Sequence, residues 1–503
     1  MLKWANKNPV ILLFLLVAIT FVVADGIHII NYPPRSIHQW RQSDCVSYAK
    51  TYYEKGSGLF SPSTYNLAGV DGKVASEFPI IYYIGGNLFH FFGVHYGILR
   101  GLNFLCYLLG IFYLYQCIGL WMKRSLLQIF PIILLATSPF YYYYALNFLP
   151  NVPAISFSFA GLYYWLMYER TSSNKHLIIG TLFFSLATLL KPTDGGLIWV
   201  AYLAVFSIKF LKHQFTKKQL LQLLICSVMI SGVIYGWYTY VKWYNDQNNN
   251  HQNLLSIYPI WMMIQHDIEY VFNERIFGFW SVVYHQKIIL YFLGLCLLLY
   301  AIRWKALNPF LRLYTLFLIL GALAYDVLWF TAFSDHDYYQ LLNVMPAVFI
   351  IITVVEWYSS KVLPKIPAKM SLGLGVVLIG LAAIAIRQNR NIQHDRYTQD
   401  MYTYVNPDIY EVEPVLRKLG IKQTDIIVSA PDPSPNITLA AYNNPGYTES
   451  FNDNNYNVSL FAKKGAKYLI INDTAYLHKP LYVPYTKKLI GKYKDNIFIF
   501  DLR

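Results

Sequence analysis

Charged residues are scarce in this sequence: of its 503 residues only 14% are Asp, Glu, Lys or Arg, whereas 56% are hydrophobic. The apolar runs repeatedly reach the roughly 20 residues that a helix needs to cross a bilayer. This composition excludes an ordinary soluble protein. It predicts an integral membrane protein built mainly from α-helices.

Acidic residues are outnumbered, with 27 Asp and Glu against 41 Lys and Arg, which gives a formal net charge of +14. The basic residues sit mostly in short loops between apolar runs, where they encode membrane topology, so we expect no nucleic-acid partner. Cysteine is also rare, with five residues and none after Cys296. The polar C-terminal part therefore cannot contain a disulfide framework.

Apolar segments of spanning length recur along the first three quarters of the chain and predict about eleven membrane spans. The first, Pro9 to Ala24, could also be a signal peptide, but we prefer an uncleaved anchor because it keeps the charge pattern consistent. The others are expected at residues 97–119, 127–149, 152–168, 176–190, 193–211, 219–241, 287–303, 311–332, 339–357 and 370–387.

The connections alternate in charge, which predicts that the N-terminus lies in the cytoplasm and that this is a multi-pass protein of the plasma or inner membrane. The cytoplasmic connections would be the basic ones, at Lys123-Arg124, 170–175, 209–218, 303–312 and 361–369. The opposite connections are longer or more acidic. Aromatic residues at span ends, such as Tyr141 to Tyr144 and Trp237 to Trp243, could stack on a sugar, but they fit an interfacial aromatic belt better.

From about residue 388 the composition becomes polar, which divides the chain into a membrane domain at 1–387 and a smaller domain at 388–503. Residues 425–429, 467–471 and 496–500 predict strands, and 408–419 and 458–464 predict helices. The alternation indicates a small α/β domain with a partly parallel sheet. The span count places this domain outside the cytoplasm.

The first outer loop, residues 25–96, carries the polar motifs that matter most for function. Trp40-Arg41-Gln42-Ser43-Asp44 precedes tyrosines at helical spacing, which predicts a helix lying along the membrane surface. Glu77 precedes Phe78-Pro79 and an amphipathic run from Ile80 to Phe92. Asp44 alone could be a solvated surface carboxylate, and Glu77 could simply cap the helix that follows it.

These features together resemble the GT-C superfamily of polyprenyl-phosphate-sugar glycosyltransferases: a long first outer loop with an aspartate, then an acidic residue and a proline leading into a juxtamembrane helix. The chain looks most similar to the branch of protein mannosyltransferases and lipid A aminoarabinose transferases. The resemblance implies an α-helical polytopic GT-C fold followed by an extracytoplasmic soluble domain.

The resemblance also implies roles for individual residues. Asp44 corresponds to the family's loop aspartate, the base that deprotonates the acceptor. Glu77 corresponds to a second acid that some members use to bind a divalent metal, so we treat a metal cofactor as optional. The family often has Lys-Pro-Pro after this acid, whereas this chain has Phe78-Pro79-Ile80. The cation for the donor phosphate therefore needs another source.

Three cationic residues are candidates for this phosphate site: Arg41 in the loop, Lys191 at a span end and His336. Lys191 could instead extend towards lipid headgroups, and His336 could be a plain loop histidine. The block around His336 continues with Tyr338 and Tyr339, which resemble a tyrosine pair that opens a late span in relatives. We expect these two tyrosines to contact substrate.

The expected function is transfer of a sugar from a polyprenyl-phosphate donor to a lipid, glycan or protein acceptor at the extracytoplasmic face. A transporter or flippase of lipid-linked glycans is an alternative, but it would favour ionisable residues in mid-span, and Asp326 is the clearest of few. An O-antigen polymerase or ligase type of protein is a further alternative with the same architecture. An oligosaccharyltransferase fits less well, because the sequence lacks the Trp-Trp-Asp tripeptide of that family.

Overall fold

The computed structural model describes residues 8–122, 126–250, 257–280, 284–365, 367–399, 405–450 and 457–503. The predicted basic loop at Lys123-Arg124 lies outside these ranges. The chain forms two compact units, each assembled from three separate stretches. The first, here called the helical unit, comprises Met1–Ile30, Gly101–Trp237 and Leu255–Asp395, and the second, the mixed unit, comprises Asn31–Arg100, Tyr238–Leu254 and Arg396–Arg503.

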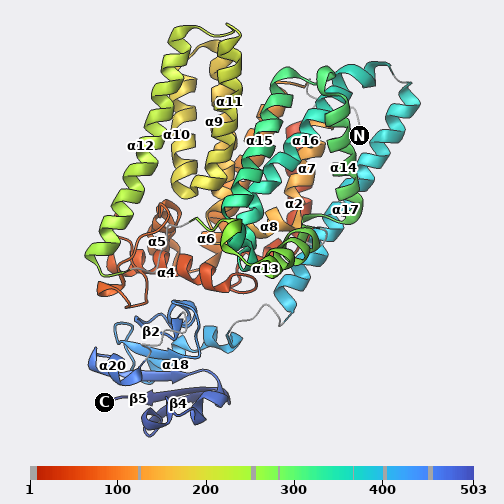
Figure 1. Cartoon of the computed structure of the whole chain (residues 1–503). Helices are drawn as coiled ribbons and strands as arrows, with labels where there is room; N and C mark the ends of the chain where they lie inside the picture. The colour runs from red at the N-terminus through yellow and green to blue at the C-terminus, as the bar shows by residue number, and fades with distance from the viewer. Residues whose placement is uncertain are drawn as a thin grey trace. The chain divides into compact units, whose positions relative to one another are not determined.

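The helical unit is built from long apolar helices (Figure 1). Those that lie wholly or mainly in it are α2 (Pro9–Val23), α6 (Tyr96–Gly119), α7 (Leu126–Ala136), α8 (Pro139–Ala145), α9 (Asn151–Thr171), α10 (Asn174–Leu190), α11 (Pro192–Leu211), α12 (Lys217–Gln247), α14 (Lys287–Ile302), α15 (Pro309–Leu328), α16 (Val344–Trp357) and α17 (Ala368–Thr398). Two shorter elements are α3 (Gly26–Ile29) and α13 (Gln265–Tyr270).

Five helical segments within the described residues are long and apolar enough to cross a membrane: α6, α11, α12, α15 and the segment Asp337–Lys365 that contains α16. Shorter apolar helices of 10–17 residues include α2, α10 and α14. The chain is therefore a multi-pass membrane protein, as predicted. The count of eleven spans and the orientation of the termini stay predictions.

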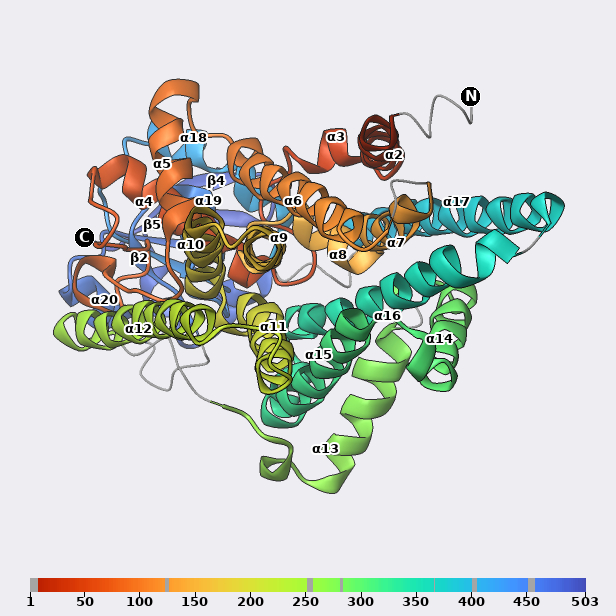
Figure 2. The same cartoon turned by 90° about the horizontal axis from the view of Figure 1, so that it is seen from above.

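Close packing within the helical unit depends on small residues. Helices α9, α10 and α11 contact one another, and α15 and α16 continue the row (Figure 2). At the α9–α10 interface a Cβ on Gly161 would lie 2.8 Å from the ring of Phe184, and one on Gly180 would lie 2.3 Å from Trp165. Glycine therefore lets these two apolar helices approach each other without loss of contact to large aromatic rings.

The segment expected as one span at 127–149 is instead broken into α7 and α8. Pro139 starts the second helix and cannot donate a backbone hydrogen bond, and Ser138 has an extended conformation before it. The prediction of an aromatic belt at 141–144 is also wrong for this short helix. All four tyrosines are 0–1% exposed, so they fill the interior of the helical unit.

The mixed unit contains a five-stranded sheet with strand order β2-β1-β3-β5-β4. The strands are β1 (Ile427–Ala430), β2 (Gly446–Tyr447), β3 (Tyr468–Ile471), β4 (Leu489–Tyr493) and β5 (Ile497–Asp501). β1 pairs in parallel with both β2 and β3, whereas β5 is antiparallel to β3 and β4. The predicted partly parallel sheet is confirmed, and β2 and β4 are strands that the sequence did not indicate.

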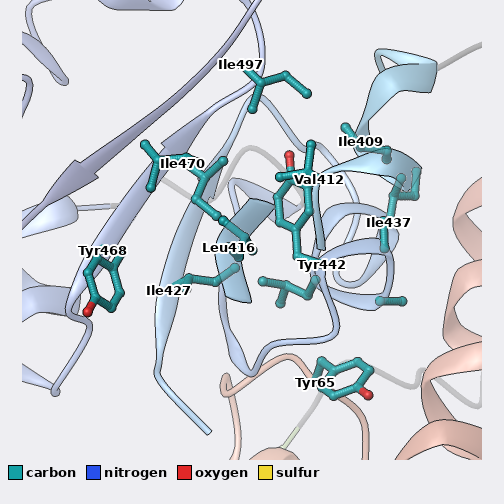
Figure 3. Close-up of a cluster of buried hydrophobic side chains, with 14 of the residues drawn as sticks. Tyr65, Ile409, Val412, Leu416, Ile427, Ile437, Tyr442, Tyr468, Ile470 and Ile497 are labelled. Atoms are coloured by element: carbon teal, nitrogen blue, oxygen red, sulfur yellow. The ribbon is translucent and has the colours of Figure 1, made fainter. Parts of the chain in front are cut away.

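Alternate residues of the strands serve two hydrophobic cores, as the period of two requires. One face carries Ile427, Ile470 and Ile497 and is covered by η11 (Pro407–Glu411), α18 (Glu413–Lys418) and α19 (Ile437–Tyr442) (Figure 3). The opposite face carries Val428 and Leu469 and is covered partly by α20 (Val458–Lys463). The predicted helix at 408–419 is thus a 3-10 turn followed by a short α-helix, because Pro414 interrupts the run.

The first outer loop belongs to the mixed unit together with this sheet. It contains α4 (Gln39–Lys55) and α5 (Ile80–Phe92), and Tyr65 between them joins the hydrophobic core in Figure 3. The Gly446 N–H donates to the Tyr65 carbonyl at 3.0 Å, and the Leu67 N–H donates to the Gly446 carbonyl at 2.9 Å. The loop and the C-terminal segment therefore lie on one side of the membrane. The division of the chain at residue 387 stays a prediction.

The shared side is predicted to be extracytoplasmic, which cysteine labelling can test. Lys463→Cys, at the exposed end of α20, should react in intact cells with a membrane-impermeant maleimide. Lys212→Cys, in a predicted cytoplasmic connection and also exposed, should react only after the membrane is permeabilised. Reaction of the Lys463→Cys protein only after permeabilisation would reverse the assigned orientation.

Candidate functional site

Helix α4 positions the residues on which the sequence-based hypothesis rests. Arg41 and Asp44 lie one turn apart and face the same side, as the 3.6-residue period requires. α4 packs against α5 and against α19 of the C-terminal segment. Tyr48 stacks on Tyr82 of α5 with ring centroids 5.6 Å apart. The predicted helix is therefore real, and it lies inside the mixed unit rather than alone on a surface.

Arg41 lies between two carboxylates. Its Nη1 is 3.7 Å from Asp44 Oδ2, and its Nη2 donates to Glu77 Oε1. Tyr82 also donates to Glu77 Oε1, at 2.9 Å. The side chains of Arg41, Asp44 and Glu77 are 24%, 15% and 11% exposed, so the cluster is mostly withdrawn from water. Glu77 does not cap α5, whose preceding residue is Pro79 with no side-chain cap.

Asp44 has a third neighbour, Asn436, whose Nδ2 donates to Asp44 Oδ1 at 2.8 Å. Burial raises the pKa of Asp44 to about 6, and the nearby Arg41 and Asn436 partly offset this rise. A carboxylate with this pKa is largely ionised at neutral pH and still a stronger base than an exposed aspartate. Such a group suits general base catalysis near neutral pH.

The other candidate residues gather in the helical unit. Lys191 links α10 to α11, and its Nζ lies 5.5 Å from the ring centroid of Tyr338 and 4.9 Å from that of Tyr339. His336 contacts the same two rings, with centroids 5.3 and 5.9 Å away. Contact with two aromatic faces helps to hold the Lys191 ammonium in place. No acidic side chain of the described residues forms an ion pair with Lys191.

Acidic groups near this second cluster are engaged by polar neighbours. Asn151 donates to the buried Asp194 at 2.5 Å, and Tyr144 donates to Asp337. Neither carboxylate forms an ion pair with Lys191, although Asp194 interacts with its charge at longer range. Lys191 is therefore the better candidate for binding an anion, whereas the charge of Arg41 is shared by two carboxylates.

The residues present do not fit a dedicated metal site. Among the described residues no three His, Cys, Asp or Glu side chains come close enough to hold an ion together. The Glu77 carboxylate already accepts hydrogen bonds from Arg41 and Tyr82. Arg41 supplies the positive charge between Asp44 and Glu77 that a metal would otherwise supply, so no step below is routed through a metal.

The seven predicted site residues thus form two groups. The mixed unit holds Arg41, Asp44 and Glu77, and the helical unit holds Lys191, His336, Tyr338 and Tyr339. Sequence reasoning missed Asn436. Its only signal was a polar turn rich in proline directly after a predicted parallel strand, a place where binding residues often lie.

The chain resembles a known protein family and several known structures. A family model described as dolichyl-phosphate-mannose-protein mannosyltransferase matches residues 76–237. The structure is similar to that of ArnT from Cupriavidus metallidurans in the apo state, with a TM-score of 0.61 and 12% identity over 99% of this chain and 98% of that one. The same protein bound to undecaprenyl phosphate matches with a TM-score of 0.60 and 14% identity, over 97% and 98% of the two chains.

The Archaeoglobus fulgidus oligosaccharyltransferase, tethered to an acceptor peptide, matches with a TM-score of 0.55 and 13% identity over 99% of this chain and 74% of that one. No curated protein matches the chain significantly. The chain therefore has the GT-C fold, and the matches support its assignment to the GT-C superfamily. The resemblance inferred from the sequence is confirmed.

Removing the shared cation should destabilise the mixed unit in a pH-dependent way. Arg41→Met keeps the apolar stem but leaves the Asp44 and Glu77 carboxylates without their counter-ion, which should cost about 1–3 kcal/mol at pH 7.5. The pKa of Asp44 would rise further, so the cost should shrink at pH 5, where this group becomes protonated. Thermal unfolding in detergent at both pH values measures the difference.

Arg35→Met is the matched control, because the Arg35 guanidinium donates to the backbone carbonyl of Tyr397 and not to a carboxylate. Its loss of stability should be the same at both pH values. An Arg41→Met deficit that is equally independent of pH would contradict the role of Arg41 as counter-ion.

Proposed function

We propose that this chain is a membrane glycosyltransferase that moves a sugar from a polyprenyl-phosphate donor to a hydroxyl group of a lipid, glycan or protein acceptor. The observation that carries the proposal is the buried Asp44 carboxylate, fixed by Arg41 and Asn436 and with a pKa raised to about 6. The fold common to the GT-C proteins supports it. The family match at 76–237, which includes Glu77 and Lys191, supports it as well.

In the proposed reaction the acceptor oxygen attacks the anomeric carbon of the donor sugar. The bond between this carbon and the phosphate oxygen breaks as the new glycosidic bond forms, and polyprenyl phosphate leaves. Asp44 takes the hydroxyl proton, so a neutral hydroxyl can act as nucleophile. Direct displacement inverts the configuration at the anomeric carbon.

The departing phosphate gains negative charge and needs a fixed cation. We assign this role to Lys191, which the rings of Tyr338 and Tyr339 hold in place and which forms no ion pair among the described residues. His336, on the same rings, is a second donor for the phosphate or the sugar. The ArnT structure with bound undecaprenyl phosphate supports a lipid-phosphate donor in general.

Arg41 and Glu77 have a different task in this scheme. The guanidinium keeps Asp44 mostly ionised despite its burial, and Glu77, held by Tyr82, keeps the guanidinium in place. The reaction face is expected to be extracytoplasmic. A transporter function is not favoured, because the matches include a mannosyltransferase family and an oligosaccharyltransferase.

The test of the proposal is Asp44→Asn in a lipid-phosphate release assay with purified protein and polyprenyl-phosphate sugars. The amide keeps the size and hydrogen bonding of the carboxylate but cannot accept a proton, so turnover should fall by roughly 10²–10⁴-fold. Donor binding should survive. In the parent, kcat/KM should fall about tenfold per pH unit below about pH 6, where Asp44 becomes protonated, and level off above it.

A folded Asp44→Asn protein with parental turnover would remove Asp44 from the mechanism. Arg35→Met again provides a control, since it changes a charge in the same loop without touching the cluster. Sugar donors that differ in the sugar and in lipid length should be tried before the parent is called inactive.

Replacing Lys191 should weaken binding of the donor without changing the titration of the proposed base, Asp44. Lys191→Met keeps the apolar stem and loses the charge, so binding of polyprenyl phosphate should weaken by about 10–100-fold. The pH dependence of the remaining turnover should match that of the parent. Lys209→Met, which breaks an ion pair with Glu169 at the other end of α11, serves as control. Unchanged binding by Lys191→Met would move the phosphate site to His336 or another cation.

A further inference from the structure

Asn436 lies in the turn between β1 and α19, far from Asp44 in sequence, and is only 2% exposed. It reaches the loop helix α4 with its side chain, where Nδ2 donates to Asp44 Oδ1 at 2.8 Å. The same amide accepts, through Oδ1, a hydrogen bond from the Asn66 backbone N–H at 3.1 Å. Both ends of the amide are thus engaged.

This double engagement fixes which end of the amide faces Asp44. A backbone N–H can only donate, so the oxygen must face Asn66, and the NH₂ group must then face the carboxylate. Rotating the amide would set two oxygens against each other at Asp44 and two donors against each other at Asn66. Asn436 therefore presents a donor, and only a donor, to Asp44.

The turn that carries Asn436 is itself held firmly. Asp432 accepts hydrogen bonds from the Ser434 N–H at 2.9 Å and hydroxyl at 2.6 Å, and from the Thr438 N–H at 2.7 Å and hydroxyl at 2.6 Å. Asp432 is completely buried. Four hydrogen bonds to one carboxylate fix the backbone on both sides of Asn436, so the position of its side chain is well defined.

We infer that Asn436 is a positioning residue for the base: it occupies Asp44 Oδ1 and leaves Oδ2, 3.7 Å from Arg41, as the oxygen that accepts the proton. This inference rests on the proposed function. It assigns the C-terminal segment a direct part in the reaction, because the orientation of the base in the first loop depends on an amide supplied almost 400 residues later.

The electrostatic surroundings give the inference a measurable consequence. The titratable groups that face Asp44 are Arg41, Cys45 and Tyr48 on α4, Glu77 before α5 and Asp432 after β1. Among the neighbours, Arg41 and Asn436 favour the ionised carboxylate, whereas Glu77 and Asp432 oppose it. Loss of the Asn436 donor should therefore raise the pKa of Asp44 and move the acidic limb of the pH profile upward.

Asn436→Leu is the main test, because leucine has a similar size and branching but no donor. The acidic limb of its kcat/KM profile should move up by about one pH unit or more from the parental value, kcat above the new limb should fall, and KM for the donor should stay near the parental value. Asn436→Ala, which is less prone to clash, should move the limb in the same direction. Thermal unfolding establishes the folded fraction of each variant.

Asn66→Leu is the matched control. It removes the 2.9 Å bond from the Asn66 side chain to the Pro435 carbonyl, and so loosens the same turn, but it leaves the contact between Asn436 and Asp44. The acidic limb of the kcat/KM profile of Asn66→Leu should stay at the parental pH. A purely structural role for Asn436 predicts lower stability and an unmoved limb.

The outcomes separate this inference from the proposed function. If Asp44→Asn is inactive but both Asn436 variants keep the parental limb, the inference is wrong and the function stands. If Asp44→Asn retains parental turnover, the proposed base fails, and the positioning role falls with it. An upward shift in the Asn436 variants and none in Asn66→Leu supports both.

Discussion

The arrangement of α4 and α5 in the mixed unit depends on the Arg41 guanidinium, which is shared by two carboxylates. Asp44 and Glu77 are mostly withdrawn from water, and a buried charge without a partner is strongly destabilising. Arg41 can serve both only if α4 and the segment before α5 keep a fixed distance. The stacking of Tyr48 on Tyr82 fixes the two helices, and the Tyr82 hydroxyl then holds Glu77 from the other side.

Apolar packing and backbone hydrogen bonds join the first loop to the C-terminal segment. The loop buries apolar side chains of its own, among them Tyr48, Ile81 and Phe89, and it also contributes one side chain to the core of the sheet. Tyr65 enters the core beneath the sheet, and the bonds of Tyr65 and Leu67 to Gly446 extend the sheet by one short bridge. Gly446 is suited to this place, because a Cβ there would lie 2.1 Å from the Ile427 carbonyl oxygen.

Local sequence patterns predict the helices and strands well but predict the contacts between them poorly. Apolar length gave the helices, and alternation gave β1, β3 and β5, because both signals come from neighbours along the chain. The break at Ser138-Pro139 was hidden by apolar residues on both sides. A run of tyrosines looks the same in sequence whether it lies in the protein interior or at the membrane interface. The sequence therefore could not place Tyr141 to Tyr144 in the interior. The contact between Asn436 and Asp44 could not be predicted, because local sequence patterns carry no information about contacts between residues far apart in the chain.

The two clusters differ in how their cation is paired, and this difference divides their tasks. With both carboxylates ionised, Asp44, Glu77 and Arg41 sum to a net charge of −1, which favours taking a proton from an acceptor and disfavours binding a phosphate. Lys191 lies against two tyrosine rings and forms no ion pair within the described residues, although the charge of the nearby Asp194 interacts with it at longer range. A leaving phosphate is attracted more strongly to a cation that is not paired directly with a carboxylate. Arg41 therefore tunes the base, and the phosphate role passes to Lys191.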